Sequence, residues 1–386
     1  MSTTQPNVER FDAIVVGGGP AGSTAARRLA LAGAHTLVLE KAQHPRYKAC
    51  GGGVPLRTLR HIDLPLDDLI EGEIRSIEVT HFGKRSFVKD CPQPFAYTVM
   101  RDRFDQRLLE GAAQAGAEVQ QGSPVRGLEL DATTARVTTE NGCYETPHLL
   151  AADGATGPIA RWADLGGGIQ RSAAYELEIS APEMALQRWS EAANIDVGYQ
   201  PWGYGWVFPK QGRLSVGVVL SPGHGNSIKL FTQRYVERLG LAGTTVTTAV
   251  GHPIRFRRSR DEIIARGPVL LLGDSAGLAD EFTAEGIAYA VHSGALAAQA
   301  IDGSSGDAAA AYQRAVDEAI QPELDAARAI SRLYYRCVTT WPTLALAVSK
   351  RVDYFWRAFF RVMRGEASYD SELNRWPLLR LSTKVL

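Results

Sequence analysis

The chain has 386 residues, of which 45% are hydrophobic and 22% charged, and its formal net charge is zero. These values exclude a disordered or fibrous protein, and the neutral charge removes the broad electrostatic attraction that nucleic-acid binders use, so no nucleic-acid partner is expected. The four cysteines are widely spaced without a CxxC pair, which favours a reduced, cytoplasmic protein without a metal site.

A β-α-β unit is predicted at the start of the chain. Residues 11–16 and 35–40 are apolar runs typical of buried parallel strands, and residues 20–32 form an Ala- and Leu-rich helix that ends at a glycine. The turn before the helix carries a GxGxxG motif, which permits a tight turn, the approach of a pyrophosphate and close helix–strand packing. Its candidate binding residues are Gly17, Gly19, Pro20, Ala21 and Gly22. Glu40 ends the second strand, where a carboxylate can accept hydrogen bonds from a ribose, and Lys41 follows it.

The later elements place a sheet between two nucleotide-binding segments. A helix is predicted over 103–115 and a buried strand over 148–152. Period-two alternation over 173–219 predicts an antiparallel sheet with one solvent-facing side. Residues 268–273 form another buried strand, 283–301 a long Ala-rich helix, and the chain beyond 307 is mainly helical. The nucleotide-binding strands lie both before and after the predicted antiparallel sheet in the sequence. An arrangement of two domains that follow one another along the chain is therefore excluded.

Two Gly-Asp segments favour FAD over NAD. Gly273 and Asp274 follow an apolar strand, so the carboxylate can bond a ribityl hydroxyl; the alternative is an Asp that caps the next turn. Asp153 and Gly154 repeat the pattern after the 148–152 strand. Thr283 is expected to cap the 283–301 helix, with Gly286 and Ile287 near its start. That helix N-terminus, aimed at the flavin pyrimidine, would stabilise the anionic reduced form.

In this order the segments resemble the flavoprotein superfamily of aromatic hydroxylases, flavin halogenases and geranylgeranyl reductases. In that superfamily the Asp274 position holds the ribityl chain and the Arg101 position lies along the cofactor. The resemblance implies an α/β fold: a Rossmann-like FAD-binding domain of aromatic-hydroxylase type, an inserted antiparallel β-sheet substrate domain and a helical C-terminal region. The expected ranges are 1–80, 100–165 and 255–305 for the FAD-binding domain, 81–99 and 166–254 for the sheet domain, and 306–386 for the helical region.

An aromatic segment in the middle of the chain narrows the resemblance. Residues that alternate along a strand share a face, so Trp202, Tyr204, Trp206 and Phe208 would form one wall, with glycines leaving the other face bare. Such a wall suits a long apolar ligand, and the Tyr hydroxyl and Trp N–H groups remain available for hydrogen bonds. The alternative is a sheet that packs its aromatic residues into its own core. The segment is similar to the YxWxFP signature of the geranylgeranyl reductases.

Two further segments resemble the same family, and one departs from it. The run over 45–55 resembles its K-x-C-G-G motif, which places Cys50, Gly51 and Gly52 near the isoalloxazine. Residues 365–369 resemble a recurring C-terminal pattern. Where the family usually reads D-P-L-T-G-E-G-I, residues 280–287 lack the proline and one glycine, which changes the loop expected beside the flavin.

The resemblance implies an FAD-dependent reductase that hydrogenates isolated double bonds of a geranylgeranyl or polyprenyl chain by protonation and hydride transfer from reduced flavin. Cys50, Tyr204 and Trp206 are the catalytic candidates. Cys50 is interpreted as proton donor or relay, with a small buried thiol as the alternative. The electron donor is expected to be NADPH or ferredoxin, and the protein a monomer or weak oligomer. The other functions considered are a flavin-dependent monooxygenase of an apolar or aromatic substrate, a flavin halogenase, and a non-catalytic flavin-bound subunit or lipid carrier.

The C-terminal region combines aromatic and basic residues. Such a composition is typical of helices that touch a membrane surface or cap a lipid tunnel, although an amphipathic helix packed on the core has it too. The residues concerned are Trp341, Tyr354, Phe355, Trp356, Phe359, Phe360, Lys350, Arg351, Arg357 and Arg361.

Overall fold

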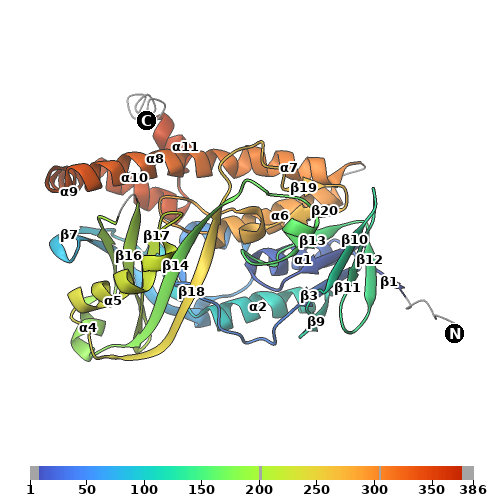
Figure 1. Ribbon diagram of the computed structural model, residues 1–386, viewed down its shortest axis with the longest axis horizontal. Coiled ribbons are helices and arrows are strands. Elements are labelled where there is room, and N and C mark those ends of the chain that lie inside the picture. Colours follow the sequence, from blue (N-terminus) through green and yellow to red (C-terminus); the bar gives the residue numbers. More distant parts are fainter. Residues whose placement is uncertain (1–7, 200–201, 304–305, 376–386) are drawn as a thin grey trace.

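The computed structural model describes residues 8–199, 202–303 and 306–375. Where a predicted domain range includes residues 1–7, 200–201, 304–305 or 376–386, those residues lie outside the described part of the chain. Two sheets lie side by side beneath a layer of C-terminal helices (Figure 1). The predicted division into domains stays a prediction.

The first sheet has six strands in the order β19-β20-β13-β2-β3-β9, parallel except for the β19–β20 pair. Their bounds are β2 Ala13–Val16, β3 Thr36–Glu40, β9 Glu118–Gln121, β13 Leu149–Ala151, β19 Ala265–Arg266 and β20 Val269–Leu271. Helices α1 (Pro20–Leu31), α2 (Arg101–Gln114) and α6 (Ile287–Asp302) pack beside it. Because the central strands are buried on both faces, they are uniformly apolar, as parallel strands usually are.

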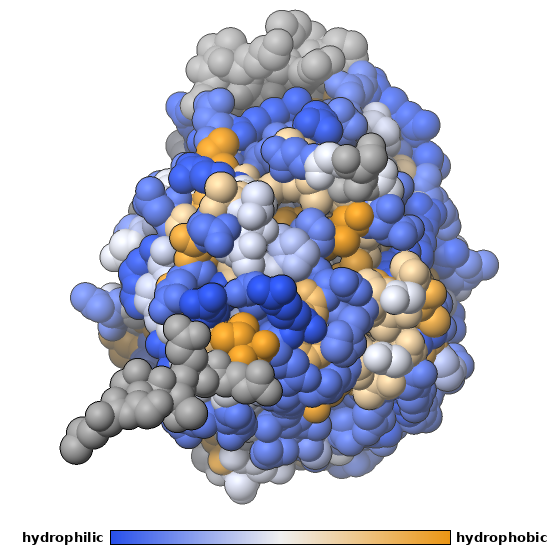
Figure 2. Space-filling view, turned by 90° about the vertical axis from the view of Figure 1, so that its right-hand side faces the viewer, coloured by the Kyte–Doolittle hydropathy of each residue, from blue (hydrophilic) through white to orange (hydrophobic). Residues whose placement is uncertain are grey.

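A four-stranded sheet, in the order β1-β12-β11-β10, contributes to the same hydrophobic core. Its strands are β1 Val8–Arg10, β10 Gly127–Leu130, β11 Ala135–Thr138 and β12 Cys143–Thr146. The short helix α3 (Ile159–Trp162) follows β13. The end of the molecule that these elements form is largely hydrophilic, with scattered apolar side chains (Figure 2).

The second large sheet has seven strands in the order β18-β14-β17-β16-β15-β6-β7, antiparallel except for the β15–β6 pair. Their bounds are β6 Ser76–His81, β7 Lys84–Asp90, β14 Gln170–Ser180, β15 Ala192–Val197, β16 Gly203–Lys210, β17 Arg213–Leu220 and β18 Thr245–Phe256. Helix α5 (Ile228–Arg238) packs on one face through Tyr235, and α4 (Glu183–Arg188) lies beside it. A small sheet of β4 Gly53–Pro55, β8 Ala96–Val99 and β5 Ile70–Ile74 lies against β16 through β5 and β8 and against α6 through β4.

The C-terminal helices run along one side of both large sheets (Figure 1). They are α7 Ala308–Ala319, α8 Gln321–Thr340, α9 Pro342–Arg351, α10 Asp353–Arg364 and α11 Tyr369–Asn374. Within the described residues, none of the helices has the length and apolar composition needed to cross a membrane.

The predicted helix over 283–301 begins later than expected. Its first residue is Ile287, with Gly286 as N-cap, so Thr283 is not the cap. The buried Asp280 carboxylate accepts hydrogen bonds from the amides of Phe282 and Thr283, at 2.9 and 2.6 Å, and from the Thr283 hydroxyl. Ala284 adopts a left-handed conformation with φ 55°. These bonds hold residues 280–286 as a turn, which delays the helix.

Candidate active site

A cavity of about 710 Å³ lies where the carboxyl ends of β2, β13 and β20 meet the seven-stranded sheet and helices α8 and α10. Ligands of open parallel sheets bind at this edge. Of the cofactor-binding residues predicted from the sequence, all but Gly22 and Gly273 line the cavity, as do Tyr204 and Trp206. The structure therefore brings together segments that are more than two hundred residues apart in the chain.

The turn between β2 and α1 leaves room for phosphates. Gly17 has φ 107°, and a Cβ there would lie 2.3 Å from the Ala152 carbonyl oxygen. A Cβ on Gly19 would meet only the Arg46 guanidinium, at 3.8 Å, so the open side of this glycine faces free space. No described side chain caps the first amides of α1. Uncapped helix N-termini bind anions, so these residues fit the phosphates of a dinucleotide.

Glu40 is fixed at the end of β3. Its carboxylate accepts hydrogen bonds from the amides of Gly18, at 2.6 Å, and Ala42, at 2.8 Å. The side chain is buried and borders the cavity. Because each carboxylate oxygen has a second lone pair, Glu40 can still accept a bond from a ribose hydroxyl.

The two Gly-Asp segments use their carboxylates differently. Asp153 accepts from the Ser275 hydroxyl at 2.7 Å and from the Ile159 amide at 3.0 Å, which ties the loops after β13 and β20 together. Burial raises the pKa of Asp153. Asp274 lies at the cavity beside Gly286, with its carboxylate 3.9 Å from the Lys48 ammonium. Asp274 is thus the freer of the two to contact a ligand.

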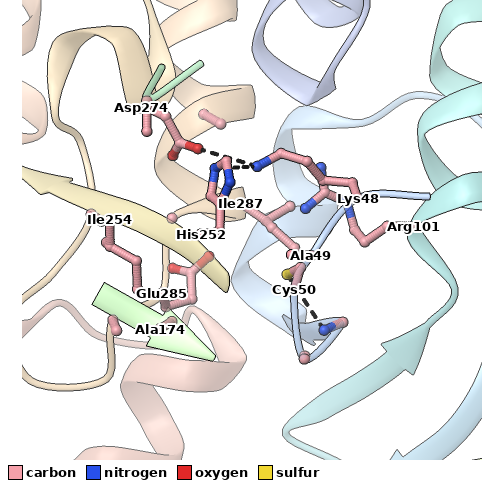
Figure 3. Close-up of a pocket in the computed structure, with 18 of the residues that line it drawn as sticks. Lys48, Ala49, Cys50, Arg101, Ala174, His252, Ile254, Asp274, Glu285 and Ile287 are labelled. Atoms are coloured by element: carbon pink, nitrogen blue, oxygen red, sulfur yellow. Dashed lines mark hydrogen bonds and ion pairs between the residues drawn. The ribbon is translucent and has the colours of Figure 1, made fainter. Parts of the chain in front are cut away.

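Lys48 and His252 form a pair at the cavity that the motif analysis missed (Figure 3). The Lys48 Nζ is 2.7 Å from the His252 Nε2. Burial lowers the pKa of Lys48, and burial together with the Lys48 charge lowers the pKa of His252 to about 4. His252 is therefore neutral at neutral pH and can accept a hydrogen bond from Lys48. Lys48 stands in the K-x-C-G-G run, but His252 lies on a plain strand with no motif around it.

Cys50 borders the cavity in a polar setting. Its Sγ accepts a hydrogen bond from the Gly52 amide at 3.4 Å. Arg101 forms a two-point ion pair with the fully buried Asp105, at 2.8 and 2.9 Å, and Arg46 lies 3.0 Å from the same carboxylate. Burial opposes the charge of Arg101, but Asp105 and Cys50 raise its pKa. Asp105, which the sequence analysis did not select, therefore fixes two guanidinium groups at the cavity.

Three of the four predicted wall residues lie together. Tyr204, Trp206 and Phe208 of β16 line the cavity, with successive ring centroids 6.3 and 6.4 Å apart. Trp202 instead precedes β16 and packs against Phe256 and Tyr335. The opposite face of β16 is not bare, because the Tyr235 ring of α5 covers Gly205, where a Cβ would come within 2.7 Å of it.

The C-terminal helices close the apolar end of the cavity. Phe355, Trp356 and Phe359 of α10 line it together with Tyr334 and Tyr335 of α8. Trp356 and Phe360, each 6% exposed, belong to the core. These α10 aromatic residues therefore face inward, as capping of the cavity or packing on the core requires. Contact of the C-terminal region with a membrane stays a prediction.

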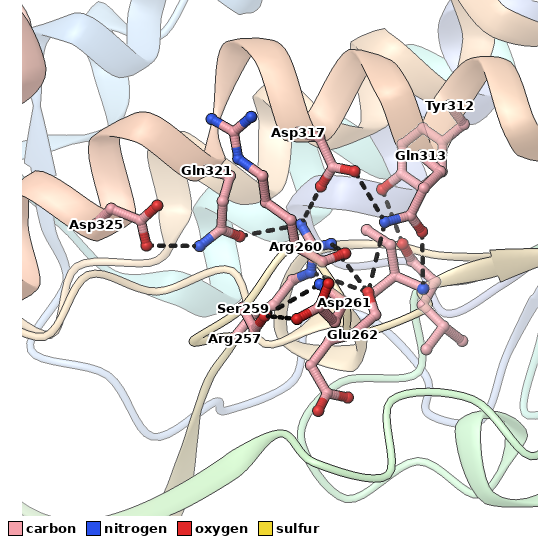
Figure 4. Close-up of polar contacts among 12 residues, drawn as sticks. Arg257, Ser259, Arg260, Asp261, Glu262, Tyr312, Gln313, Asp317, Gln321 and Asp325 are labelled. Atoms are coloured by element: carbon pink, nitrogen blue, oxygen red, sulfur yellow. Dashed lines mark hydrogen bonds and ion pairs between the residues drawn. The ribbon is translucent and has the colours of Figure 1, made fainter.

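A buried arginine anchors α7 and α8 (Figure 4). Arg257 bonds the Asp317 carboxylate at 2.7 Å and the Gln321 side-chain oxygen at 3.0 Å. It also donates to the Glu262 carbonyl oxygen. Since Arg257 follows β18 directly, this network fixes α8 where its aromatic residues reach the cavity.

The loop that departs from the family pattern also packs against the C-terminal helices. Glu281 forms a two-point ion pair with Arg258, at 2.8 and 2.7 Å. The Phe282 ring packs edge-on against both Tyr334 and Phe355, at centroid distances of 5.8 and 6.3 Å. Burial raises the pKa of Asp280, at the start of this loop, to about 6.

Fold and cavity together define a flavoprotein with an aromatic-hydroxylase type of FAD-binding domain, and the family described as FAD binding domain matches residues 10–311. The chain is 30% identical over 380 residues to the chloroplastic geranylgeranyl diphosphate reductase of Oryza sativa subsp. japonica, covering 92% of this chain and 76% of that protein. It is 32% identical over 320 residues to the digeranylgeranylglycerophospholipid reductase of Thermoplasma volcanium, covering 76% and 78%.

A solved geranylgeranyl bacteriochlorophyll reductase-like structure from Thermoplasma acidophilum has the same fold, with a TM-score of 0.75, 24% identity, and coverage of 98% of this chain and 100% of that one. The chain therefore belongs to the geranylgeranyl reductase family of FAD-dependent oxidoreductases. The predicted family and fold class are confirmed.

Proposed function

We propose that this protein hydrogenates isolated double bonds of a geranylgeranyl or other polyprenyl chain. The observation that carries the proposal is one cavity that joins the dinucleotide-type turn at Gly17 to an apolar end enclosed by β16, α8 and α10. A long isoprenoid needs such an apolar end. The relatives named as geranylgeranyl reductases support the same substrate class.

The residues at the cavity divide the work of binding. FAD, when bound, supplies the two reducing electrons. The glycine turn and the N-terminus of α1 hold its phosphates, Glu40 its ribose and Asp274 its ribityl chain. The aromatic residues of β16 and α10 hold the prenyl chain and exclude water. An isolated alkene has no electron-withdrawing neighbour, so a residue at the cavity must also provide a proton, and Cys50 is the donor or relay.

The function is tested with enzyme reduced by dithionite and incubated without oxygen with geranylgeranyl diphosphate and geranylgeranylated lipids. We expect products that gain one H₂ for each bond reduced, detected by mass spectrometry. An unchanged ligand would leave only a carrier role. If oxygenated products appear when reduced enzyme meets air and an apolar substrate, the monooxygenase alternative is correct instead. Running NADPH and reduced ferredoxin in place of dithionite identifies the electron donor.

Replacing Cys50 by alanine is expected to slow single-turnover alkene reduction by about 100-fold, the usual contribution of a positioned proton donor. FAD affinity, measured by flavin fluorescence, should stay unchanged because the thiol is small. Cys337→Ala on α8 is the control and should keep the wild-type rate. Full single-turnover activity in Cys50→Ala would remove this residue from the mechanism.

The exposed face of α9 is proposed as the contact with a lipid surface. Trp341, Leu344, Val348 and Val352 recur at helical spacing and are between 40% and 62% exposed. Lys350 and Arg351 lie in the last turn of the same helix. An apolar strip next to cations is typical of interfacial helices, and α9 connects α8 and α10, the two helices that enclose the cavity.

Replacing Trp341 and Leu344 together by alanine is expected to weaken co-sedimentation with anionic liposomes at least about tenfold, because each side chain would bury apolar area in the lipid. Met184→Ala is the control, since Met184 is 83% exposed but lies on α4. Equal sedimentation of both variants and wild type, or no sedimentation at low salt, contradicts this proposal.

A further inference from the structure

Two carboxylates and one ammonium are buried together next to Cys50. Glu176 and Glu178 lie on β14 and Lys210 on β16, and all three residues are at most 5% exposed. Lys210 forms an ion pair with Glu178. If every group were ionised, the cluster would hold one uncompensated negative charge away from water, which is costly. Holding one proton on a carboxyl removes that charge.

Glu176 is the member of the cluster that reaches the cavity. One of its carboxyl oxygens accepts a hydrogen bond from the Cys50 amide, and the other accepts from the Ser215 hydroxyl at 3.1 Å. Ser215 in turn accepts from the Trp206 indole at 3.3 Å. The carboxyl thus lies against both the Cys50 segment and the aromatic wall, where an alkene would lie under the proposed function.

The surroundings of Glu176 favour its protonated form. The titratable or charged groups that face Glu176 come from three segments: Glu178 on the same strand, Lys210 of β16, and Tyr47 and Cys50 before β4. The two remaining neighbouring strands contribute only neutral residues, Ser215 of β17 and Val250 of β18. Burial raises the pKa of Glu176, Lys210 opposes this change, and Glu178 adds to it.

Tyr47 offers a path from Glu176 to solvent. Its side chain lines the cavity and is 38% exposed. Burial, the charges of Glu176 and Glu178 and a hydrogen bond with Glu176 raise the pKa of Tyr47. Its hydroxyl therefore keeps its proton at neutral pH. The hydroxyl can donate this proton to the Glu176 carboxylate and accept a replacement proton from water.

We propose that Glu176 stores the proton that alkene reduction consumes and that Tyr47 resupplies it from solvent, a role that rests on the proposed function. In the step, the O–H bond of Glu176 breaks and a C–H bond forms at one alkene carbon, directly or through the Cys50 thiol. The hydrogen and electron pair of the second new C–H bond would come together, as a hydride, from the reductant, reduced FAD, when that cofactor is bound. Glu176 is left as a carboxylate, which Tyr47 reprotonates before the next turnover.

The first test measures the proton itself and needs no substrate. We expect the infrared C=O stretching band of a protonated carboxylic acid at pH 7 in the wild-type protein and its loss in Glu176→Gln. Glu178→Gln removes the neighbour that raises the pKa of Glu176, so the band should disappear at a lower pH than in wild type. A difference spectrum between wild type and Glu176→Gln that lacks this band overturns the proposal even if alkene reduction itself is confirmed.

The second test separates proton storage from proton resupply. Glu176→Gln, which preserves size and keeps one acceptor oxygen for the Cys50 amide, should slow single-turnover reduction about 100-fold while FAD affinity stays within about twofold. Tyr47→Phe should keep the single-turnover rate and slow only steady-state turnover. Wild-type activity must fall as pH rises through the raised pKa of Glu176, and in Glu178→Gln this fall must move to lower pH. A wild-type rate and pH profile in Glu176→Gln contradicts the role; loss of activity only in Cys50→Ala assigns the proton to the thiol instead.

Discussion

Replacing Gly22 by alanine is expected to destabilise the protein by about 3 kcal/mol, the upper range for forcing atoms into a packed interior, and to abolish FAD binding. A Cβ at this position would lie 2.0 Å from the Gly17 carbonyl oxygen, which is a steric clash. It would also lie 3.0 Å from the Val15 Cγ1 atom, at the lower limit of van der Waals contact. Because Val15 lies on β2 and Gly17 begins the turn after it, the helix would have to move away from the strand. Urea denaturation and flavin fluorescence titration measure the two effects.

Gly19→Ala is the matched variant three residues earlier. Its Cβ would meet only Arg46 at 3.8 Å, and its φ of −81° is ordinary for alanine. The free energy of unfolding should therefore change by less than about 1 kcal/mol, as at other unstrained sites, while the affinity for FAD falls because the methyl group occupies the space open to the pyrophosphate. Equal loss of stability in the two variants, or undiminished FAD affinity in Gly19→Ala, would contradict this assignment of roles.

Replacing Lys210 by methionine is expected to cost about 3–5 kcal/mol of stability at neutral pH, since removing one partner leaves a buried carboxylate uncompensated. Lys210 also holds down the pKa of Glu176, which burial has already raised. Without Lys210 this pKa rises further, so the variant keeps more of its stability at low pH and loses it as pH rises through the new value. Denaturation curves at about pH 5 and about pH 8 should show the larger deficit at the higher pH.

The double variant Lys210→Met, Glu178→Leu distinguishes charge from packing. Replacing both partners of a buried ion pair by apolar residues of similar size is often close to neutral, so the double variant should recover most of the stability that the single variant loses. If the double variant is as unstable as Lys210→Met, the loss of stability arises from the missing packing of the lysine side chain. The explanation by an uncompensated buried carboxylate is then wrong.

The sequence predicted the segments whose function depends on local geometry. The GxGxxG turn requires glycines at fixed spacing between a strand and a helix, and Asp274 comes shortly after its strand, so neighbouring residues alone are enough to predict their roles. The strand that carries Tyr204, Trp206 and Phe208 likewise places alternate side chains on one face whatever surrounds it. By contrast, the start of α6 was missed, because the side chain of Asp280 holds Thr283 in a turn that a capping pattern does not reveal.

The sequence by itself determined the cofactor class, the family and the strand whose aromatic residues line the cavity, because these follow from short-range spacing. Only the tertiary structure decided the surroundings of the site. Glu176 and Glu178 alternate along β14 as solvent-facing residues of a half-exposed sheet would, yet they are 2% and 1% exposed. The Cys50 segment and the neighbouring strands cover them, and Lys48 meets His252, 204 positions away. Burial and such long-range pairs change the cost of a charge, and no local pattern records them.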